Sequence, residues 1–191
     1  MIVSTVALEF AAHGYEGASL SRIVREAGTS KGGLYYWFED KQDLFVHTAG
    51  TVLSPLGIAV GKPGPVGSVE GFWSAVLGMF ERGWAFLRAD QTALSMLRVA
   101  VRGRAAGDLN RGWKELTADS MGAATEIVLL GRTVGAVRDD LPSDLLIAMV
   151  IGIAEAADLW FEDQIDEMDE EEVQGAIEAL QDVLKRVASP G

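Results

Sequence analysis

The sequence predicts an all-α fold of about nine helices. Apolar residues recur at spacings of three and four along most of the chain, which is the period of a helix with one buried face. No stretch shows the alternation of apolar and polar residues that indicates a half-buried strand. Glycine and proline interrupt the helical pattern, most clearly in the loop GKPGPVGS over Gly61–Ser68. We therefore predict two helical domains, residues 1–47 and residues 48–191.

The first two predicted helices have clear inward faces and clear ends. Helix one covers about Ile2–His13, and Gly14 ends it. Helix two follows Ser19, whose hydroxyl can accept a hydrogen bond from a backbone N–H of the first turn. Its apolar residues lie at helical spacing: Leu20, Ile23, Val24 and Ala27. Gly28 stands where a left-handed residue commonly ends a helix.

A short third helix is predicted within Thr29–Lys41, TSKGGLYYWFEDK. Ser30 is a suitable N-cap, and the next three residues form the first turn. A glycine in a helix costs about 1 kcal/mol relative to alanine. Gly32 and Gly33 together therefore suggest that the backbone here approaches another molecule closely. A helix, a glycine, a short turn and a Ser-capped second helix form the pattern of a helix-turn-helix, whose second helix enters the major groove of DNA.

The segment Tyr15–Phe45, YEGASLSRIVREAGTSKGGLYYWFEDKQDLF, resembles the DNA-binding domain of TetR-type transcriptional repressors. The shared features are GYxxxS before helix two, AGxSKGxLYYxF through the turn and helix three, and KxxLF at the start of helix four. Two residues depart from the family pattern, since Trp37 stands where histidine is frequent and Gly33 where a threonine-like side chain is common. The resemblance implies a dimer that binds palindromic operator DNA and is released by a small hydrophobic effector. Activation in place of repression remains open.

The predicted DNA contacts lie in helices two and three and at the start of helix four. Lysine side chains, tyrosine hydroxyls and the N–H groups of the two glycines suit phosphate oxygens, whereas serine and tyrosine side chains can also reach base edges. The predicted set is Ser19, Ser21, Ser30, Lys31, Gly32, Gly33, Tyr35, Tyr36 and Lys41. Trp37 is expected to pack inside the domain and not to touch DNA.

The remaining helices are predicted at about Lys41–Leu53, Val69–Ala89, Thr92–Val101, Leu109–Leu130, Asp144–Phe161 and Glu172–Val187. The helix over Asp144–Phe161 is apolar nearly all round, so it must be buried on more than one side. Together with the apolar stripe of the last helix, it predicts a two-fold homodimer. The predicted dimerisation residues are Met149, Val150, Ile153, Ala157, Trp160, Ile177, Leu180 and Leu184.

Aromatic residues on the fifth and seventh predicted helices suggest an effector pocket. Ligand sites are concave and mostly apolar, with a few polar groups. The predicted lining is Trp73, Phe80, Trp84, Trp113 and Met121, with Glu81 and Glu155 as polar groups. A carboxylate among aromatic rings favours a flat, apolar ligand, cations included. Plain core packing is the alternative interpretation of most of these residues.

Composition excludes several classes of protein. Without cysteine there is no disulfide, thiol catalysis or cysteine-ligated metal, and the two histidines are far apart in sequence. No nucleophile–base pair is visible, so we predict neither an enzyme nor a cofactor. The longest uninterrupted apolar run, Leu145–Ala154, is too short to cross a bilayer. With no visible signal peptide, we expect a cytoplasmic protein without a membrane partner.

The net charge of −12 is unusual for a DNA-binding protein. Even residues 1–47 hold six acidic and only four basic side chains. A basic surface is the usual first sign of a DNA binder, so binding here would depend on a few well-placed cations, and weak non-specific affinity is expected. The alternative interpretation is an acidic helical interaction module without DNA activity.

Overall fold

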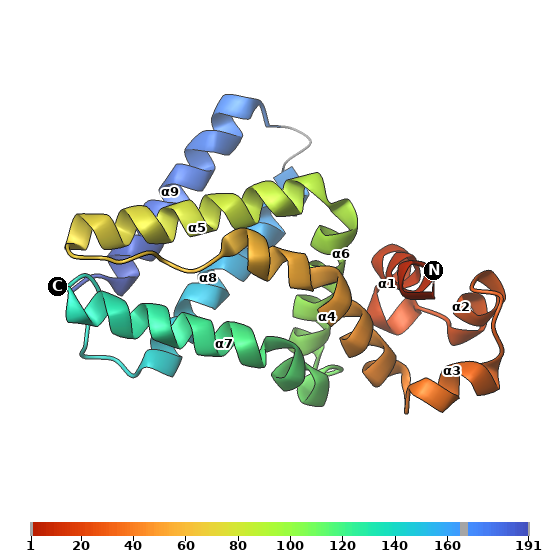
Figure 1. Ribbon diagram of the computed structural model, residues 1–191. Coiled ribbons are helices and arrows are strands. Elements are labelled where there is room, and N and C mark those ends of the chain that lie inside the picture. The colour runs from red at the N-terminus through yellow and green to blue at the C-terminus, as the bar shows by residue number, and fades with distance from the viewer. Residues whose placement is uncertain (1, 165–167, 191) are drawn as a thin grey trace. The chain divides into compact units, whose positions relative to one another are not determined.

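A computed structural model describes residues 2–164 and 168–190, which form nine α-helices and no strand (Figure 1). The helices are α1 Ile2–Gly17, α2 Leu20–Glu26, α3 Lys31–Trp37, α4 Lys41–Val60, α5 Val69–Ala89, α6 Gln91–Ala106, α7 Asn110–Thr133, α8 Ser143–Gln164 and α9 Glu170–Ala188. The predicted all-α class is confirmed.

The chain divides into two compact units. Unit 1 comprises residues 1–61 and 81–120, and unit 2 comprises residues 62–80 and 121–191. Helices α5 and α7 therefore contribute residues to both units. The predicted boundary after residue 47 lies inside α4, which continues unbroken to Val60. The division into functional domains 1–47 and 48–191 remains a prediction, because it concerns activity and not packing.

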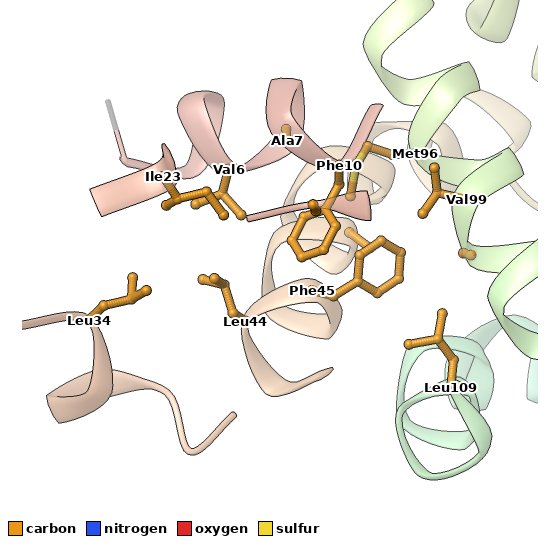
Figure 2. Packing of buried hydrophobic residues seen from close by; sticks show 13 residues of the cluster. Val6, Ala7, Phe10, Ile23, Leu34, Leu44, Phe45, Met96, Val99 and Leu109 are labelled. Atoms are coloured by element: carbon orange, nitrogen blue, oxygen red, sulfur yellow. The ribbon is translucent and has the colours of Figure 1, made fainter. Parts of the chain in front are cut away.

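The core of unit 1 holds α2 and α3 in place against α1 and α4 (Figure 2). The ring of Phe10 from α1 meets the ring of Phe45 from α4 edge-on, with ring centroids 4.9 Å apart. Ile23 of α2 and Leu34 of α3 are also buried in this cluster. Aromatic pairs in this arrangement contribute about 0.5–1.5 kcal/mol beyond the burial of their surface. Leu20 and Val24 of α2 and Phe38 after α3 pack against the same cluster and help to orient the two short helices.

The core of unit 2 is built around Phe72 of α5, with Val128 of α7 and Leu146 of α8. Gly131 allows α7 to approach this ring closely, since a Cβ atom at that position would lie 2.6 Å from Cζ of Phe72. Arg132 then orders the turn before α8, because its guanidinium donates hydrogen bonds to the carbonyl oxygens of Leu141 at 2.6 Å and Arg138 at 3.0 Å.

Several helices differ from their predicted bounds for local reasons. Helix α1 continues to Gly17, and Gly14 makes a kink (φ 68°) where an end was predicted. Helix α9 begins two residues earlier than predicted, because Asp169 and Glu172 form a capping box. Helix α6 runs to Ala106, beyond the predicted end at Val101. These ends depend on caps and packing that apolar spacing does not show.

Helix α4 passes through Pro55, which cannot donate a backbone hydrogen bond to the carbonyl of Thr51. The hydroxyl of Ser54 donates to that carbonyl oxygen at 3.2 Å and satisfies it. Among the described helices, α4 alone is long and apolar enough to cross a membrane by length and composition. Leu44 and Phe45 of its first half are nevertheless buried in the core of unit 1, as in a helix that packs inside a protein.

Candidate DNA-binding surface

Two Ser-capped helices joined by a short turn form the centre of the candidate surface. The Ser19 hydroxyl accepts a hydrogen bond from the N–H of Arg22 at 3.4 Å, and the Ser30 hydroxyl accepts one from the N–H of Gly33 at 2.9 Å. Gly28 between the helices is left-handed, with φ 62°. The predicted helix, glycine, turn and capped helix are confirmed. Both serine oxygens are used as caps, but each hydroxyl can still donate a bond.

A buried carboxylate fixes α2 to α1. The side chain of Glu9 is only 4% exposed, and its Oε1 accepts hydrogen bonds from the N–H of Ser19 at 2.7 Å and from Nε of Arg22 at 2.8 Å. These bonds outweigh the desolvation of the carboxylate, and the bond from Arg22 is the largest cause that lowers the pKa of Glu9. The network therefore holds the start of α2 at a set position on the scaffold.

Sequence reasoning missed the role of Glu9, counting it only as negative charge. A signal was available, because Glu9 lies directly before Phe10 on the inward side of an amphipathic helix. A charged residue on such a face is almost never buried unless it is paired. The partner, Arg22, lies thirteen residues further on in another helix, so the pairing itself needed the tertiary structure.

The outer face of α3 is aromatic and exposed. Tyr35 is 49% exposed, Tyr36 79% and Trp37 75%, whereas Leu34 is 3% exposed and points into the core. The predicted outward placement of the tyrosines is therefore confirmed. The prediction that Trp37 packs inside is wrong, because Leu34 and the half-buried Phe38 already supply the inward contacts of this seven-residue helix.

The turn leaves little room for a side chain at Gly33. A Cβ atom there would lie 3.1 Å from Oγ1 of Thr29 and 3.2 Å from Oγ of Ser30, which is tighter than ordinary packing. The N–H of Gly33 is already donated to Ser30, so the prediction that this group holds a phosphate is not supported by its bonding. Gly32 is different, because a Cβ atom there would have only the Ser30 hydroxyl oxygen within 4.0 Å.

The basic side chains near α3 differ in how many of their N–H donors are already used within the protein. Arg22 binds Glu9, as described above. Nζ of Lys41 donates to the carbonyl oxygen of Glu16 at 2.9 Å and lies 5.0 Å from the centroid of the Tyr15 ring. Lys31 is exposed and has no ion pair within the described part of the chain. It is therefore the predicted cation most available to a phosphate, while Lys41 keeps two of its three N–H donors.

Arg25 is a further candidate that the sequence-based set omitted. It lies one helical turn after the exposed Ser21, so both share a face of α2. Its guanidinium is 72% exposed and pairs with the exposed carboxylate of Glu26 at 3.4 Å. Exposed pairs of this kind are worth little and can be exchanged for a phosphate. The spacing from Ser21 was the signal that could have identified it.

An acidic groove limits the candidate surface on one side. This groove, of about 230 Å³, is lined by Glu39, Gln42, Asp43, Val46, Gly112 and Glu115, all in unit 1. Its three carboxylates would repel phosphate groups. Apart from Lys41, the side chains that suit DNA therefore lie on the exposed faces of α2 and α3.

The predicted effector residues are divided between the two units. Glu81, Trp84 and Trp113 belong to unit 1, whereas Trp73, Phe80, Met121 and Glu155 belong to unit 2. Trp73 is 7% exposed and packs in the core of unit 2 against Phe72, with ring centroids 5.1 Å apart. This position favours the core interpretation for Trp73. The side chain of Trp113 lies outside the described residues, and the pocket remains a prediction.

Helix α8 carries an apolar stripe on its exposed face. The stripe consists of Leu145, Ala148, Met149, Gly152, Ala156, Leu159 and Trp160. Of the predicted dimerisation residues, Met149 and Trp160 lie on it, being 39% and 50% exposed. Val150, Ile153 and Ala157 are half-buried, as are Leu180 and Leu184 of α9. Ile177 is 8% exposed, so its predicted role at a subunit surface is wrong, because its own chain already covers it.

Comparison with known proteins agrees with this geometry. Residues 2–48 match the family described as bacterial regulatory proteins, tetR family. The HTH-type transcriptional repressor Rv1474c of Mycobacterium tuberculosis is 29% identical over 137 residues, covering 72% of this chain and 67% of that protein. The HTH-type transcriptional repressor AcnR of Corynebacterium diphtheriae is also 29% identical, covering 72% and 66%. The match thus spans about two thirds of each relative's length.

Solved structures share the fold at low sequence identity. A tetR family transcription regulator from Shewanella sp. PV-4 superposes with a TM-score of 0.75 at 18% identity, covering 95% of both chains. The regulator FadR of Bacillus subtilis, solved in complex with stearoyl-CoA, gives a TM-score of 0.68 at 16% identity, covering 98% of this chain and 96% of that one. At such identities the likeness concerns the arrangement of the helices alone.

Proposed function

Because the chain belongs to the tetR family of bacterial regulatory proteins, we propose that it is a helix-turn-helix repressor that binds operator DNA as a dimer and leaves it when a small apolar effector binds. The observation that carries this proposal is the pair of Ser-capped helices whose second member exposes Tyr35, Tyr36 and Lys31. The prediction that the chain is not an enzyme is confirmed, since the family consists of regulators and the relatives are repressors.

In this proposal α3 is the recognition helix. Phosphate contacts fix the register of a protein on DNA, and contacts to base edges select the sequence. Lys31 and Tyr36 suit phosphates, with Lys41 in support. Ser21 and Tyr35 suit base edges, because both are exposed and carry a hydroxyl that donates and accepts hydrogen bonds. The low positive charge of this surface predicts strong dependence on a few contacts and weak binding to unrelated DNA.

The dimer and the effector complete the proposed mechanism. We propose a two-fold dimer through the exposed stripe of α8, and binding to DNA requires that its two recognition helices lie about 34–36 Å apart, one turn of DNA. An effector that binds more tightly to dimers whose recognition helices have a different spacing would lower the fraction of dimers able to bind DNA. The FadR neighbour was solved with stearoyl-CoA, a ligand with a long apolar chain and an anionic CoA group, and its apolar chain is in keeping with the proposed effector. Such a regulator would work in the cytoplasm.

An acidic interaction module without DNA activity is the second candidate, and the acidic groove at the start of α4 favours it. A gel-shift assay with the DNA that flanks the protein's own coding sequence separates the two. We expect a discrete complex that unlabelled flanking DNA displaces and unrelated DNA displaces poorly. No complex at low salt, for the full chain at micromolar concentration, would favour the second candidate.

Replacement of Lys31 by alanine is expected to weaken binding similarly on all DNA sequences. One lost phosphate contact should reduce the slope of log K against log salt concentration by about one unit. Lys62→Ala is the matched control, because Lys62 is an exposed lysine in unit 2 that pairs with Glu126, at 3.6 Å. Its slope should match that of the wild type. An unchanged slope for Lys31→Ala would remove Lys31 from the phosphate contacts.

Tryptophan fluorescence is expected to report the effector. Hydrophobic cations and neutral compounds should quench the emission and release DNA if Glu81 or Glu155 faces the bound molecule, because carboxylates and aromatic rings both attract cations. The measurement is a titration with cationic, neutral and anionic compounds of similar size, followed by gel shift. Release by anions only would contradict the carboxylate-centred site and would favour the arginines of α6, Arg98, Arg102 and Arg104.

A further inference from the structure

We propose that Trp37 is a specificity-determining DNA contact, whose indole ring supplies the apolar contact that Gly33 cannot make. This inference rests on the proposed function. Its first observation is that Trp37 is 75% exposed. The other tryptophans whose side chains the structure describes are half-exposed or less. Tryptophan is highly buried on average. A tryptophan left exposed beside a second exposed aromatic ring marks a surface for another molecule.

Trp37 and Tyr36 form one aromatic surface at the end of α3. Their ring centroids lie 5.1 Å apart and the planes meet at 87°, so the edge of one ring faces the other. Tyr36 is 79% exposed. Such edge-to-face pairs are favourable, and the contact restricts the motion of both side chains. An apolar surface that is ordered before binding loses less entropy when a partner arrives.

The spacing of Gly33 and Trp37 places the indole where the helix otherwise lacks a side chain. Residues four apart lie on the same face of a helix. Side chains of a helix lean toward its N-terminus, so the indole of Trp37 is directed toward the turn that contains Gly33, but it leaves the surface beside Gly33 open, with none of its own atoms within 4 Å of a Cβ built there. Gly33 presents no side chain and cannot gain one without crowding Thr29 and Ser30. A molecule lying against this face can therefore contact the exposed indole of Trp37, whereas Gly33 offers it no side chain.

The neighbouring side chains favour DNA as the occupant. The exposed residues of α2 and α3 include Lys31 and Tyr35 on α3 and Ser21 and Arg25 on α2, which provide cations and hydroxyl groups suited to phosphates and base edges. The major groove adds apolar features that an aromatic ring can contact, above all the methyl group of thymine. An apolar protein partner would offer no acceptor to these cations and hydroxyl groups, so it is the less suitable occupant.

Fluorescence tests the contact directly. The wild type and Trp37→Phe are titrated with the duplex that shifts in the gel assay, and tryptophan emission is followed. We expect DNA to quench the wild type, and Trp37→Phe to bind with no comparable quench, since the reporter has been removed and an aromatic ring remains. An equal quench in both proteins would overturn the proposal, because the signal would then come from other tryptophans.

Affinity tests the role in specificity. Trp37→Ala should lose about tenfold or more in affinity for that duplex and less for an unrelated one, since a contact to base edges contributes only at the correct sequence. The salt slope should stay at the wild-type value, unlike that of Lys31→Ala, because no charge is removed. The thermal midpoint should also stay, because the residue is exposed. Leu8→Ala, which removes another exposed apolar side chain (61% exposed), is the matched control.

Three outcomes would overturn the inference in different ways. If Trp37→Ala binds both duplexes as tightly as the wild type does, Trp37 does not contact DNA, and the proposed function still stands. Wild-type protein that binds neither duplex would overturn the proposed function together with this inference. Trp37→Ala could also bind DNA with unchanged specificity but a reduced salt slope. Trp37 would then act indirectly, through nearby phosphate contacts, and the proposal would be wrong.

Discussion

Met149→Glu is expected to turn a dimer into a monomer and to reduce operator affinity by two orders of magnitude or more. Met149 lies on the exposed apolar stripe of α8, where the proposed interface would cover it. In a two-fold dimer each substitution occurs twice, and an unpaired carboxylate buried at an interface costs several kcal/mol. A monomer would also lose the effective concentration that joins two half-sites, which contributes about 10²–10⁴ in affinity.

Light scattering at micromolar concentration and gel shift on the same samples provide the measurements. Leu129→Glu is the matched control, because Leu129 is a 52% exposed leucine of α7 in the same unit but outside the stripe. This variant should remain dimeric and bind DNA as the wild type does. A wild-type protein that is monomeric at this concentration would contradict the interface, and so would a Met149→Glu protein that stays dimeric.

Glu9→Gln is expected to lower the free energy of unfolding by about 1–3 kcal/mol, since two hydrogen bonds lose a charged acceptor, while the Arg22 side chain, 36% exposed, can still be hydrated. The Glu9 carboxylate is almost fully covered and accepts bonds from Arg22 and from the backbone of Ser19. The same variant should bind DNA more weakly, because the start of α2 would lose its anchor on α1. Urea unfolding followed by circular dichroism measures the first effect.

The stability difference between wild type and Glu9→Gln should depend on pH. The pKa of Glu9 is lowered in the folded protein from its ordinary value of 4.5, chiefly by the hydrogen bond from Arg22. The stabilisation is therefore fully present above pH 4.5 and is lost as the pH falls through the lower folded value. The two unfolding curves should converge in that acidic range. Curves that stay parallel down to acid unfolding would show that the carboxylate is not the stabilising species.

Glu16→Gln is the control for both measurements. Glu16 lies in the same helix but is exposed, so its side chain should contribute within about 0.5 kcal/mol. A loss in this variant equal to that of Glu9→Gln would indicate a general effect of charge on α1. It would then contradict the specific role of the buried carboxylate.

The sequence alone determined the all-α class, the two capped helices and the short turn of the DNA-binding part. These features depend on local rules. Helical spacing identifies a face, a serine before a helix satisfies its first N–H groups, and a glycine supplies the left-handed residue that ends α2. Ser19, Ser30 and Gly28 act within three residues of their own position, so no knowledge of distant contacts was needed.

The tertiary structure alone decided which side chains remain exposed and can contact a partner molecule. Whether Trp37 points inward depended on Leu34 and Phe38 filling the core, and whether Ile177 is exposed depended on how its own chain folds over it. The ion pair that fixes α2 joins residues in different helices, so its partner could not be read from periodicity. Local propensity specifies where a helix lies in the chain, but the competition among side chains for a limited core decides which of its faces meets a partner.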